Sequence, residues 1–191
     1  MSYQSLKKSV FVNGDFSIVP LRENDMESIR QLRNAQMNVL RQKLEITKES
    51  QQLYFQNVVS PLFLNDSPTQ LLFSFLQNDN VIGYGGLVNI SWQDKRAEMS
   101  FLVKPEITSI NSDYKKAMSE FISLTKELVF KEMNFNRLFT ETYAFRDLHI
   151  SILLENGFKE EGQMREHIFE NGKFYDSIVH SILKEDDDVK S

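Results

Sequence analysis

Residues 71–103 constrain the fold more than any other stretch, because three apolar runs there are separated by two short polar turns. The runs are 71–76, 81–90 and 97–103, and the last of them alternates between apolar and polar residues. This pattern predicts three consecutive antiparallel strands. Three glycines, at 83, 85 and 86, lie in the middle run. Because glycine weakens a strand, they indicate a bulge, or room for a neighbouring backbone or a ligand.

The flanking segments predict further strands and helices. Asn13-Gly14 and Asn171-Gly172 are strong hairpin signals between apolar runs. With the alternation of other segments, they predict the remaining strands, at 10–12, 16–21, 137–143, from 158, 164–169 and 175–183. Apolar residues at helical spacing predict the helices, at 22–36, 47–60, 114–133 and 147–155. We expect a loop over 104–113 and flexible ends over 1–9 and 185–191.

The totals limit the kinds of protein that this chain can be. We expect one domain spanning residues 1–191. The net charge of −5 gives no basic face for nucleic acid. Without cysteine there is no disulfide, thiolate nucleophile or zinc–thiolate site, and the histidines lack metal-ligand spacing. No run has the length and apolar character of a membrane helix or a signal peptide, so we expect a cytoplasmic protein without a metal or membrane partner.

The segment 33–46 has no clear hydrophobic period and carries three cations, Arg33, Arg41 and Lys43. Two interpretations are open. The segment is either a solvated basic surface or a loop that contacts the anionic part of a phosphorylated substrate. The helix after it carries three glutamines, at 51, 52 and 56, whose amide groups suit sugar hydroxyls.

The order of elements and several short motifs resemble a known family. The motifs are Asn136-Arg137-Leu138, Glu155-Asn156-Gly157-Phe158, Glu161-Gly162 with Arg165, and Gly172-Lys173 with Tyr175-Asp176. Together they resemble the GNAT superfamily of acetyl-coenzyme A-dependent N-acetyltransferases, over residues 15 to 184. The nearest branch holds the ribosomal-protein N-terminal and the nucleotide-amino-sugar acetyltransferases. The resemblance implies an α/β (α+β) fold, in which about four helices flank a mixed, mostly antiparallel sheet of about seven strands, and acetyl-CoA as co-substrate.

The coenzyme-binding loop of the family is altered in this chain. The family usually has an Arg/Gln-x-x-Gly-x-Gly/Ala loop before the long helix, where backbone N–H groups bind the coenzyme pyrophosphate. Aligned through Phe130, that loop falls at 113–118, which contains no glycine. The resemblance therefore implies that Lys115 and Lys116 bind the pyrophosphate together with the helix end, which includes Ala117 and Met118.

Two positions on the following helix also depart from the family. The family's usual asparagine falls at Arg146, which can also reach an anion, so we assign Arg146 to the coenzyme. The tyrosine that acts as general acid in some branches falls at Leu153. A thiol leaving group has a pKa of about 8.5, so it can leave without a strong acid. The leucine therefore does not exclude catalysis.

Glu98 is the candidate for the base that accepts the proton of the attacking amine. It alternates with the apolar residues Ala97, Met99 and Phe101, and the resemblance places a glutamate at this position near the acceptor. The alternative is a cross-strand ion pair. The backbone of Phe101, Leu102 and Val103 is expected to bind the pantetheine arm as an added strand. Of the histidines, His149 lies nearest to the expected cleft.

The acceptor that we favour is a nucleotide-linked amino sugar, as a small-molecule amine. Its binding residues are predicted to be Arg33, Asn34, Arg41, Gln42, Tyr84, Gly85 and Tyr175. Two alternatives are open. One is acetylation of protein N-termini, and the other is a binding module that has lost the coenzyme and its activity. The sequence is compatible with a monomer or a homodimer.

Overall fold

The computed structural model describes residues 1–40 and 42–188. Its strands form one sheet: β1 Phe11–Asn13, β2 Phe16–Pro20, β3 Leu71–Gln77, β4 Asn80–Ser91, β5 Arg96–Val103, β6 Arg137–Tyr143, β7 Lys159–Glu170 and β8 Lys173–Leu183. Its α-helices are α1 Met26–Asn34, α2 Lys48–Tyr54, α3 Ser60–Leu62, α4 Pro105–Thr108, α5 Asn111–Lys126, α6 Asp147–Glu155 and α7 Lys184–Asp188. Short 3₁₀ turns flank α1, and π-helical turns follow α2 and α5.

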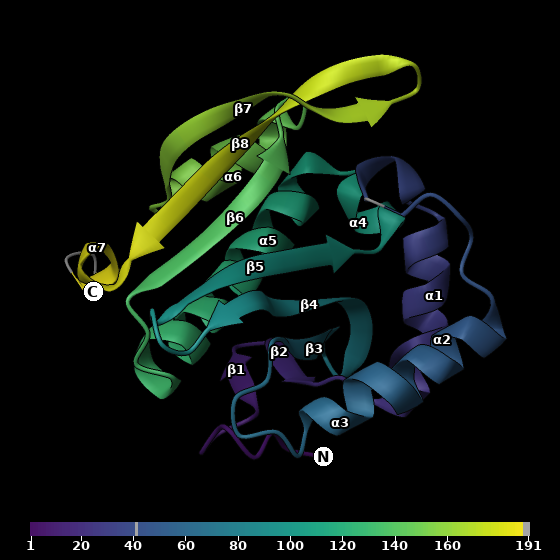
Figure 1. Cartoon of the computed structure of the whole chain (residues 1–191), viewed down its shortest axis with the longest axis vertical. Helices are drawn as coiled ribbons and strands as arrows, with labels where there is room; N and C mark the ends of the chain where they lie inside the picture. Colours follow the sequence, from purple (N-terminus) through teal and green to yellow (C-terminus); the bar gives the residue numbers. More distant parts are fainter. Residues whose placement is uncertain (41, 189–191) are drawn as a thin grey trace.

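The sheet has the strand order β1-β2-β3-β4-β5-β6-β8-β7 (Figure 1). Every neighbouring pair is antiparallel except β5 and β6, which are parallel. The predicted strands at 71–76, 81–90 and 97–103 are confirmed as β3, β4 and β5. The sheet therefore has the predicted mixed, mostly antiparallel character, with eight strands rather than about seven.

The four predicted helices correspond to α1, α2, α5 and α6, and three short helices were missed. The expected loop over 104–113 contains α4 and the start of α5. The expected flexible tail begins with α7, where Asp187 pairs with Lys126 of α5 at 3.1 Å. The helix expected over 47–60 continues without a break through a π-helical turn into α3, so Pro61 lies within one helical stretch.

The N-terminal segment, which we expected to be flexible, contributes two residues to the core. Tyr3 and Leu6 are buried. The Tyr3 hydroxyl donates to the Leu72 carbonyl at 2.7 Å and accepts from the Leu72 N–H at 2.8 Å. Its ring packs on Phe63 and Phe73, and burial raises its pKa. Both hydroxyl bonds bind this segment to the start of β3.

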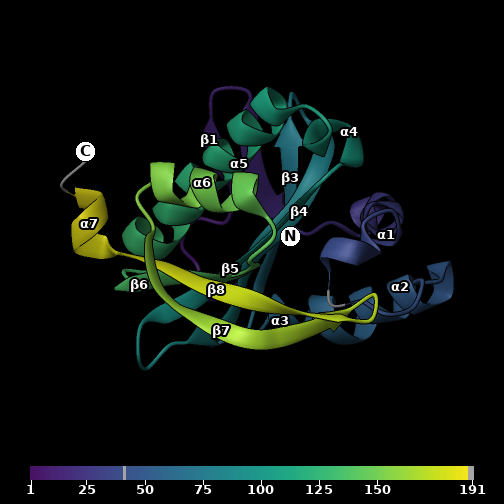
Figure 2. The same cartoon turned by 90° about the horizontal axis from the view of Figure 1, so that it is seen from above.

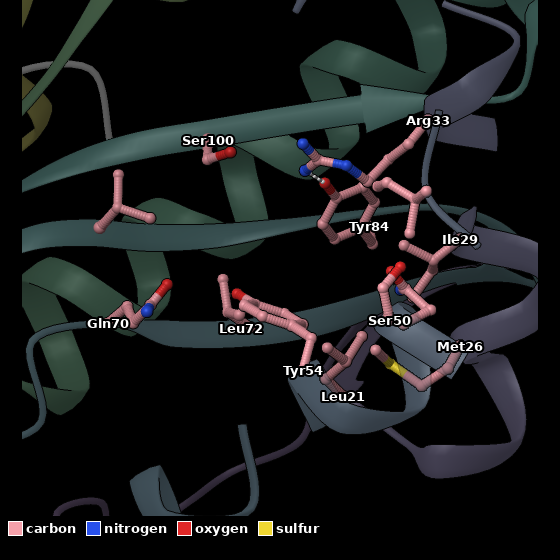
Figure 3. Close-up of a pocket in the computed structure, with 13 residues that line it drawn as sticks. Leu21, Met26, Ile29, Arg33, Ser50, Tyr54, Gln70, Leu72, Tyr84 and Ser100 are labelled. Carbon is pink, nitrogen blue, oxygen red and sulfur yellow. Dashed lines mark hydrogen bonds between the residues drawn. The ribbon is translucent and has the colours of Figure 1, made fainter. Parts of the chain in front are cut away.

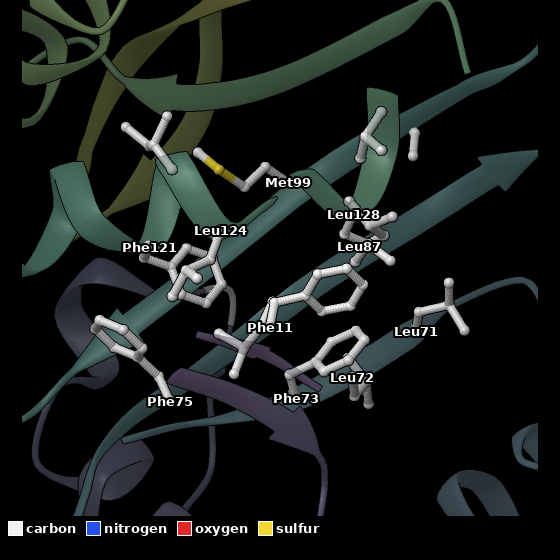
Figure 4. Close-up of a cluster of buried hydrophobic side chains, with 14 of the residues drawn as sticks. Phe11, Leu71, Leu72, Phe73, Phe75, Leu87, Met99, Phe121, Leu124 and Leu128 are labelled. Carbon is white, nitrogen blue, oxygen red and sulfur yellow. The ribbon is translucent and has the colours of Figure 1, made fainter. Parts of the chain in front are cut away.

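Helix α5 covers one face of the sheet and α6 lies beside it, whereas α1 and α2 lie on the other side (Figures 1 and 2). The core under α5 is aromatic (Figure 4). The Phe121 ring lies 5.2 Å from that of Phe75 and 4.8 Å from that of Phe101. Side chains alternate along a strand, so the residues of β4 and β5 that do not face α5 point toward α1 and α2. The face of the sheet opposite α5 is therefore the one available for a functional site.

Candidate active site

The parallel strands β5 and β6 diverge, and this divergence creates the central cleft. Their pairing runs from Arg96 opposite Arg137 to Glu98 opposite Phe139, and within the described residues it ends there. Beyond this point a cavity of about 270 Å³ lies between them, and it also reaches the start of α6. The edge of β5 after Glu98 thus has no strand partner in the described residues. An extended ligand can hydrogen-bond to such an edge.

The predicted coenzyme segment, Phe101 to Val103, lies along this edge. Leu102 and Val103 are buried, and the ring of Phe101, which lines the cleft, packs on that of Phe121 in α5. The Val103 carbonyl already accepts a hydrogen bond of 2.8 Å from the Gln36 side chain. The remaining backbone groups are compatible with the predicted role.

Glu98 lines the cleft at the point where the two strands separate. Its Oε2 accepts a hydrogen bond of 2.6 Å from Nδ2 of Asn89. Asn89 lies in a β-bulge of β4 with a φ of 48°. Such left-handed dihedrals suit asparagine better than most residues. The cross-strand partner is therefore a neutral amide rather than the cation of an ion pair.

A second carboxylate, Glu141 of β6, lines the same cleft, and the sequence analysis missed it. Its side chain is 16% exposed, and Oε1 lies 3.6 Å from Nε2 of His167 on β7. The register places Glu141 two residues beyond Phe139, the partner of Glu98. The available signal was alternation, because Leu138, Thr140 and Thr142 are buried whereas Glu141 is only partly buried. Without the β5–β6 register, this signal could not be connected to Glu98.

Arg146, Tyr114 and His149 form a hydrogen-bonded group at the other end of the cleft. Nη2 of Arg146 donates to the Tyr114 hydroxyl at 3.0 Å, and that hydroxyl lies 2.6 Å from Nδ1 of His149. His149 is almost fully buried; burial, with the charge of Arg146, lowers its pKa well below the usual range. Burial also raises the pKa of Tyr114. Arg146 and His149 line both the cleft and a neighbouring cavity of about 560 Å³, and Tyr114 lines the latter.

The predicted pyrophosphate residues at 113–118 lie within α5. Helix α5 begins at Asn111, so these residues are helical and not a loop. Lys115 pairs with Glu155 at 2.6 Å, and the Lys116 ammonium lies over the ring of Phe16. Ala117 and Met118 are buried in the core. The connection between β5 and α5 contains the short helix α4.

A separate cavity of about 390 Å³ lies between α1, α2 and the sheet (Figure 3). Arg33 and Tyr84 line it, as predicted for acceptor residues, and the Arg33 guanidinium donates to the Tyr84 hydroxyl. Gln51 also lines it, whereas the other two glutamines of this helix, at 52 and 56, are exposed. The lining side chains not predicted include Ser50, Tyr54, Gln70 and Ser100.

Other predicted acceptor residues lie outside this cavity. Asn34 and Gln42 bond to each other at 2.8 Å, and Asn34 also bonds to the backbone of Ile46, so they fix the loop after α1. Lys43 of the same loop pairs with Glu170 of β7. Tyr175 packs on Phe145 with ring centres 5.1 Å apart. Arg41 lies outside the described residues.

Gly85 does not face the acceptor cavity in this structure, because the side on which a Cβ atom would lie faces α5. A Cβ atom there would lie 2.2 Å from the Ser100 carbonyl oxygen and 2.7 Å from Cζ of Phe121. The glycine therefore permits close packing of β5 and α5 against β4. Of the two explanations considered for the glycines, room for a neighbouring backbone applies at this position.

The two cavities meet beside Glu98. Val88 and Ser100 line both the cavity between α1, α2 and the sheet and the cleft between β5 and β6. Glu98 pairs with Val88 across β4 and β5. A group entering from α1 and α2 can thus approach a ligand lying along β5 next to a carboxylate. Among the described residues there is no cluster of three or more metal-ligating side chains. No helix in the described part of the chain has the length and apolar character needed to cross a membrane.

Comparisons with known proteins concern the family and the fold of this chain. A family model described as an acetyltransferase (GNAT) domain matches residues 18–179. The uncharacterized N-acetyltransferase YoaA of Bacillus subtilis is 28% identical over 105 residues, which cover 54% of this chain and 56% of YoaA. The prophage-derived YokL of the same organism is 31% identical over 67 residues, or 38% of its length. The matches thus span about half or less of these relatives.

Solved structures of SpeG, a spermidine/spermine N-acetyltransferase of Vibrio cholerae, have the same fold. A mutant form of SpeG has a TM-score of 0.77 at 20% identity, covering 94% of this chain and all of SpeG. SpeG in complex with CoA and spermine has a TM-score of 0.75 at 19% identity, covering 91% of this chain and 98% of SpeG. At this identity the likeness concerns the fold.

Proposed function

We propose that this chain, which belongs to the GNAT acetyltransferase family, transfers an acetyl group from acetyl-coenzyme A to a primary amine. The observation that carries the proposal is the junction of the two cavities at Val88 and Ser100, with Glu98 beside it. One cavity lies along the unpaired edge of β5, and the other opens between α1 and α2. This arrangement suits a direct reaction between two bound substrates.

The coenzyme supplies the acetyl group as a thioester. The backbone of Phe101 to Val103 orients its pantetheine arm, and Arg146 provides a positive charge for its anionic part. An ammonium group cannot attack a thioester, so the amine must first lose a proton. Glu98 is placed to accept that proton, and the Asn89 amide holds its carboxylate in position. Glu141 is the alternative proton acceptor in the same cleft.

The cavity between α1, α2 and the sheet favours an acceptor that is anionic or neutral, in contrast to the polyamine named with SpeG. Among the described residues that line it, Arg33 is the charged one, and the others are apolar, hydroxyl or amide side chains. A polycationic amine would be repelled by the guanidinium and would find no carboxylate. A volume of about 390 Å³ has room for the sugar portion of a nucleotide-linked amino sugar, with the nucleotide portion outside the cavity. We therefore retain a nucleotide-linked amino sugar as the acceptor, with the N-terminus of a protein as the alternative.

Replacing Arg33 by glutamine is expected to raise KM for an anionic amino sugar by about 10- to 100-fold, because a charge-assisted hydrogen bond contributes about 1.5–3 kcal/mol. KM for acetyl-coenzyme A should change little. Initial-rate kinetics with both substrates varied test this. Lys48→Met, which removes an exposed cation of α2 outside the cavity, is the control. An unchanged KM for every accepted anionic acceptor would remove the case for sugar nucleotides and leave the protein N-terminus.

Thermal melting with acetyl-coenzyme A, with coenzyme A and with neither tests the transferase proposal itself. A ligand at 100 times its dissociation constant stabilises the folded state by about 2.7 kcal/mol. For a domain of this size that corresponds to an increase in Tm of roughly 5–10 °C. The absence of any shift at millimolar coenzyme would favour a binding module without activity. A shift would justify screening amines, beginning with amino sugar nucleotides.

A further inference from the structure

The hydrogen bonds among Arg146, Tyr114 and His149 have a defined order of donors and acceptors. The arginine can only donate, so the Tyr114 oxygen accepts from Nη2 at 3.0 Å. The single hydroxyl proton of Tyr114 is then directed at Nδ1 of His149, 2.6 Å away. His149 must therefore accept at Nδ1, which requires a neutral ring with its proton on Nε2. Its burial favours this neutral form.

The buried side chains of this hydrogen-bonded group hold the Arg146 guanidinium in position. The Tyr114 side chain is 5% exposed and that of His149 is 6% exposed, so neither can move without disturbing the packing between α5 and α6. Arg146 donates one N–H to Tyr114, and its other N–H donors remain available to a ligand in the cavities that it lines. In the described part of the chain it has no carboxylate within ion-pairing distance, and it is the only cation that lines either cavity.

The charges around Arg146 select an anion at one end of the site. The β5–β6 cleft also contains Glu98 and Glu141, and the neighbouring cavity of about 560 Å³ contains Asp147 at the start of α6. The two glutamates lie where β5 and β6 separate, whereas Arg146 is shared with the cavity beside α4 and α5. An anionic ligand portion is thus favoured at the Arg146 end and disfavoured next to Glu98.

We propose that Tyr114 and His149 are positioning residues that hold Arg146 as the diphosphate ligand for the coenzyme, in place of a glycine-rich loop. This inference rests on the proposed function and concerns how the coenzyme is bound. The helix start at Asn111 has no glycine and the lysines after it point elsewhere, so the fixed guanidinium replaces them as the anion ligand. Tyr114 acts through Arg146 and need not touch the coenzyme.

A double-mutant cycle on coenzyme A affinity tests this. Arg146→Met is expected to raise the dissociation constant about 10- to 100-fold, and Tyr114→Phe about tenfold, as measured by calorimetry. Because Tyr114 acts through Arg146, the double variant should match Arg146→Met alone within about twofold. Multiplicative effects in the double variant would overturn the proposal, as would a Tyr114→Phe variant with unchanged affinity.

A second ligand and a control variant separate positioning from general destabilisation. Pantetheine lacks the diphosphate, so the KM for S-acetylpantetheine should be the same in Tyr114→Phe and in the unmodified protein, whereas the KM for acetyl-coenzyme A rises. An equal rise for both donors would overturn the proposal. Tyr3→Phe removes another doubly bonded buried hydroxyl, which lines neither of the cavities that contain Arg146, and should lower Tm without changing coenzyme affinity. If the unmodified protein binds no coenzyme A, the proposed function itself fails.

Discussion

Glu98→Gln is expected to lower kcat by about 10²- to 10⁴-fold, the usual contribution of a positioned general base. Glutamine has nearly the same shape and can still bond to Asn89, but it cannot accept a proton from the amine. The KM for acetyl-coenzyme A should change little, since the backbone of β5 and Arg146 are untouched. Steady-state kinetics with saturating coenzyme and an accepted amine provide the measurement.

Glu141→Gln is the matched comparison, because this carboxylate lines the same cleft. If Glu98 is the base, Glu141→Gln should change kcat by less than about tenfold. A large loss in Glu141→Gln with nearly full activity in Glu98→Gln would transfer the role to Glu141 and its neighbour His167. Large losses in both would indicate that the two carboxylates share the proton transfer.

Gly85→Ala is expected to destabilise the fold by about 3 kcal/mol, near the upper end for overpacking of a core. The added methyl group would lie 2.2 Å from the Ser100 carbonyl oxygen, which belongs to the backbone of β5 and cannot rotate away. It would also lie 2.7 Å from Cζ of Phe121, at the centre of the aromatic core under α5. For a domain of this size, Tm should fall by roughly 6–12 °C.

Gly162→Ala is the control for that substitution. Gly162 also lies in a strand, β7, but a Cβ atom there would meet nothing within 4 Å. Its Tm should stay within about 2 °C of the unmodified protein. Equal shifts in the two variants, measured by scanning calorimetry, would contradict the packing explanation and reopen the possibility that Gly85 is needed for a ligand.

The sequence by itself determined the elements of this protein and the residue types of its active strand. Apolar runs bounded by short polar turns placed β3, β4 and β5. Alternation with period two, which depends on the strand alone, put Glu98 opposite the apolar residues of β5. The spacing of apolar residues likewise located α1, α2, α5 and α6. The order of these elements was sufficient for the resemblance to the GNAT family, which the family match supports.

The tertiary structure alone decided where these elements separate, and this separation makes the site. The pairing of β5 and β6 joins segments about forty residues apart in the chain and stops at Glu98, which brings Glu141 into the cleft. The packing of α5 against α6 pairs Lys115 with Glu155 and brings the Tyr114 hydroxyl to Arg146. Local patterns record burial and periodicity, whereas a cavity depends on which distant segments pack together and where their pairing ends.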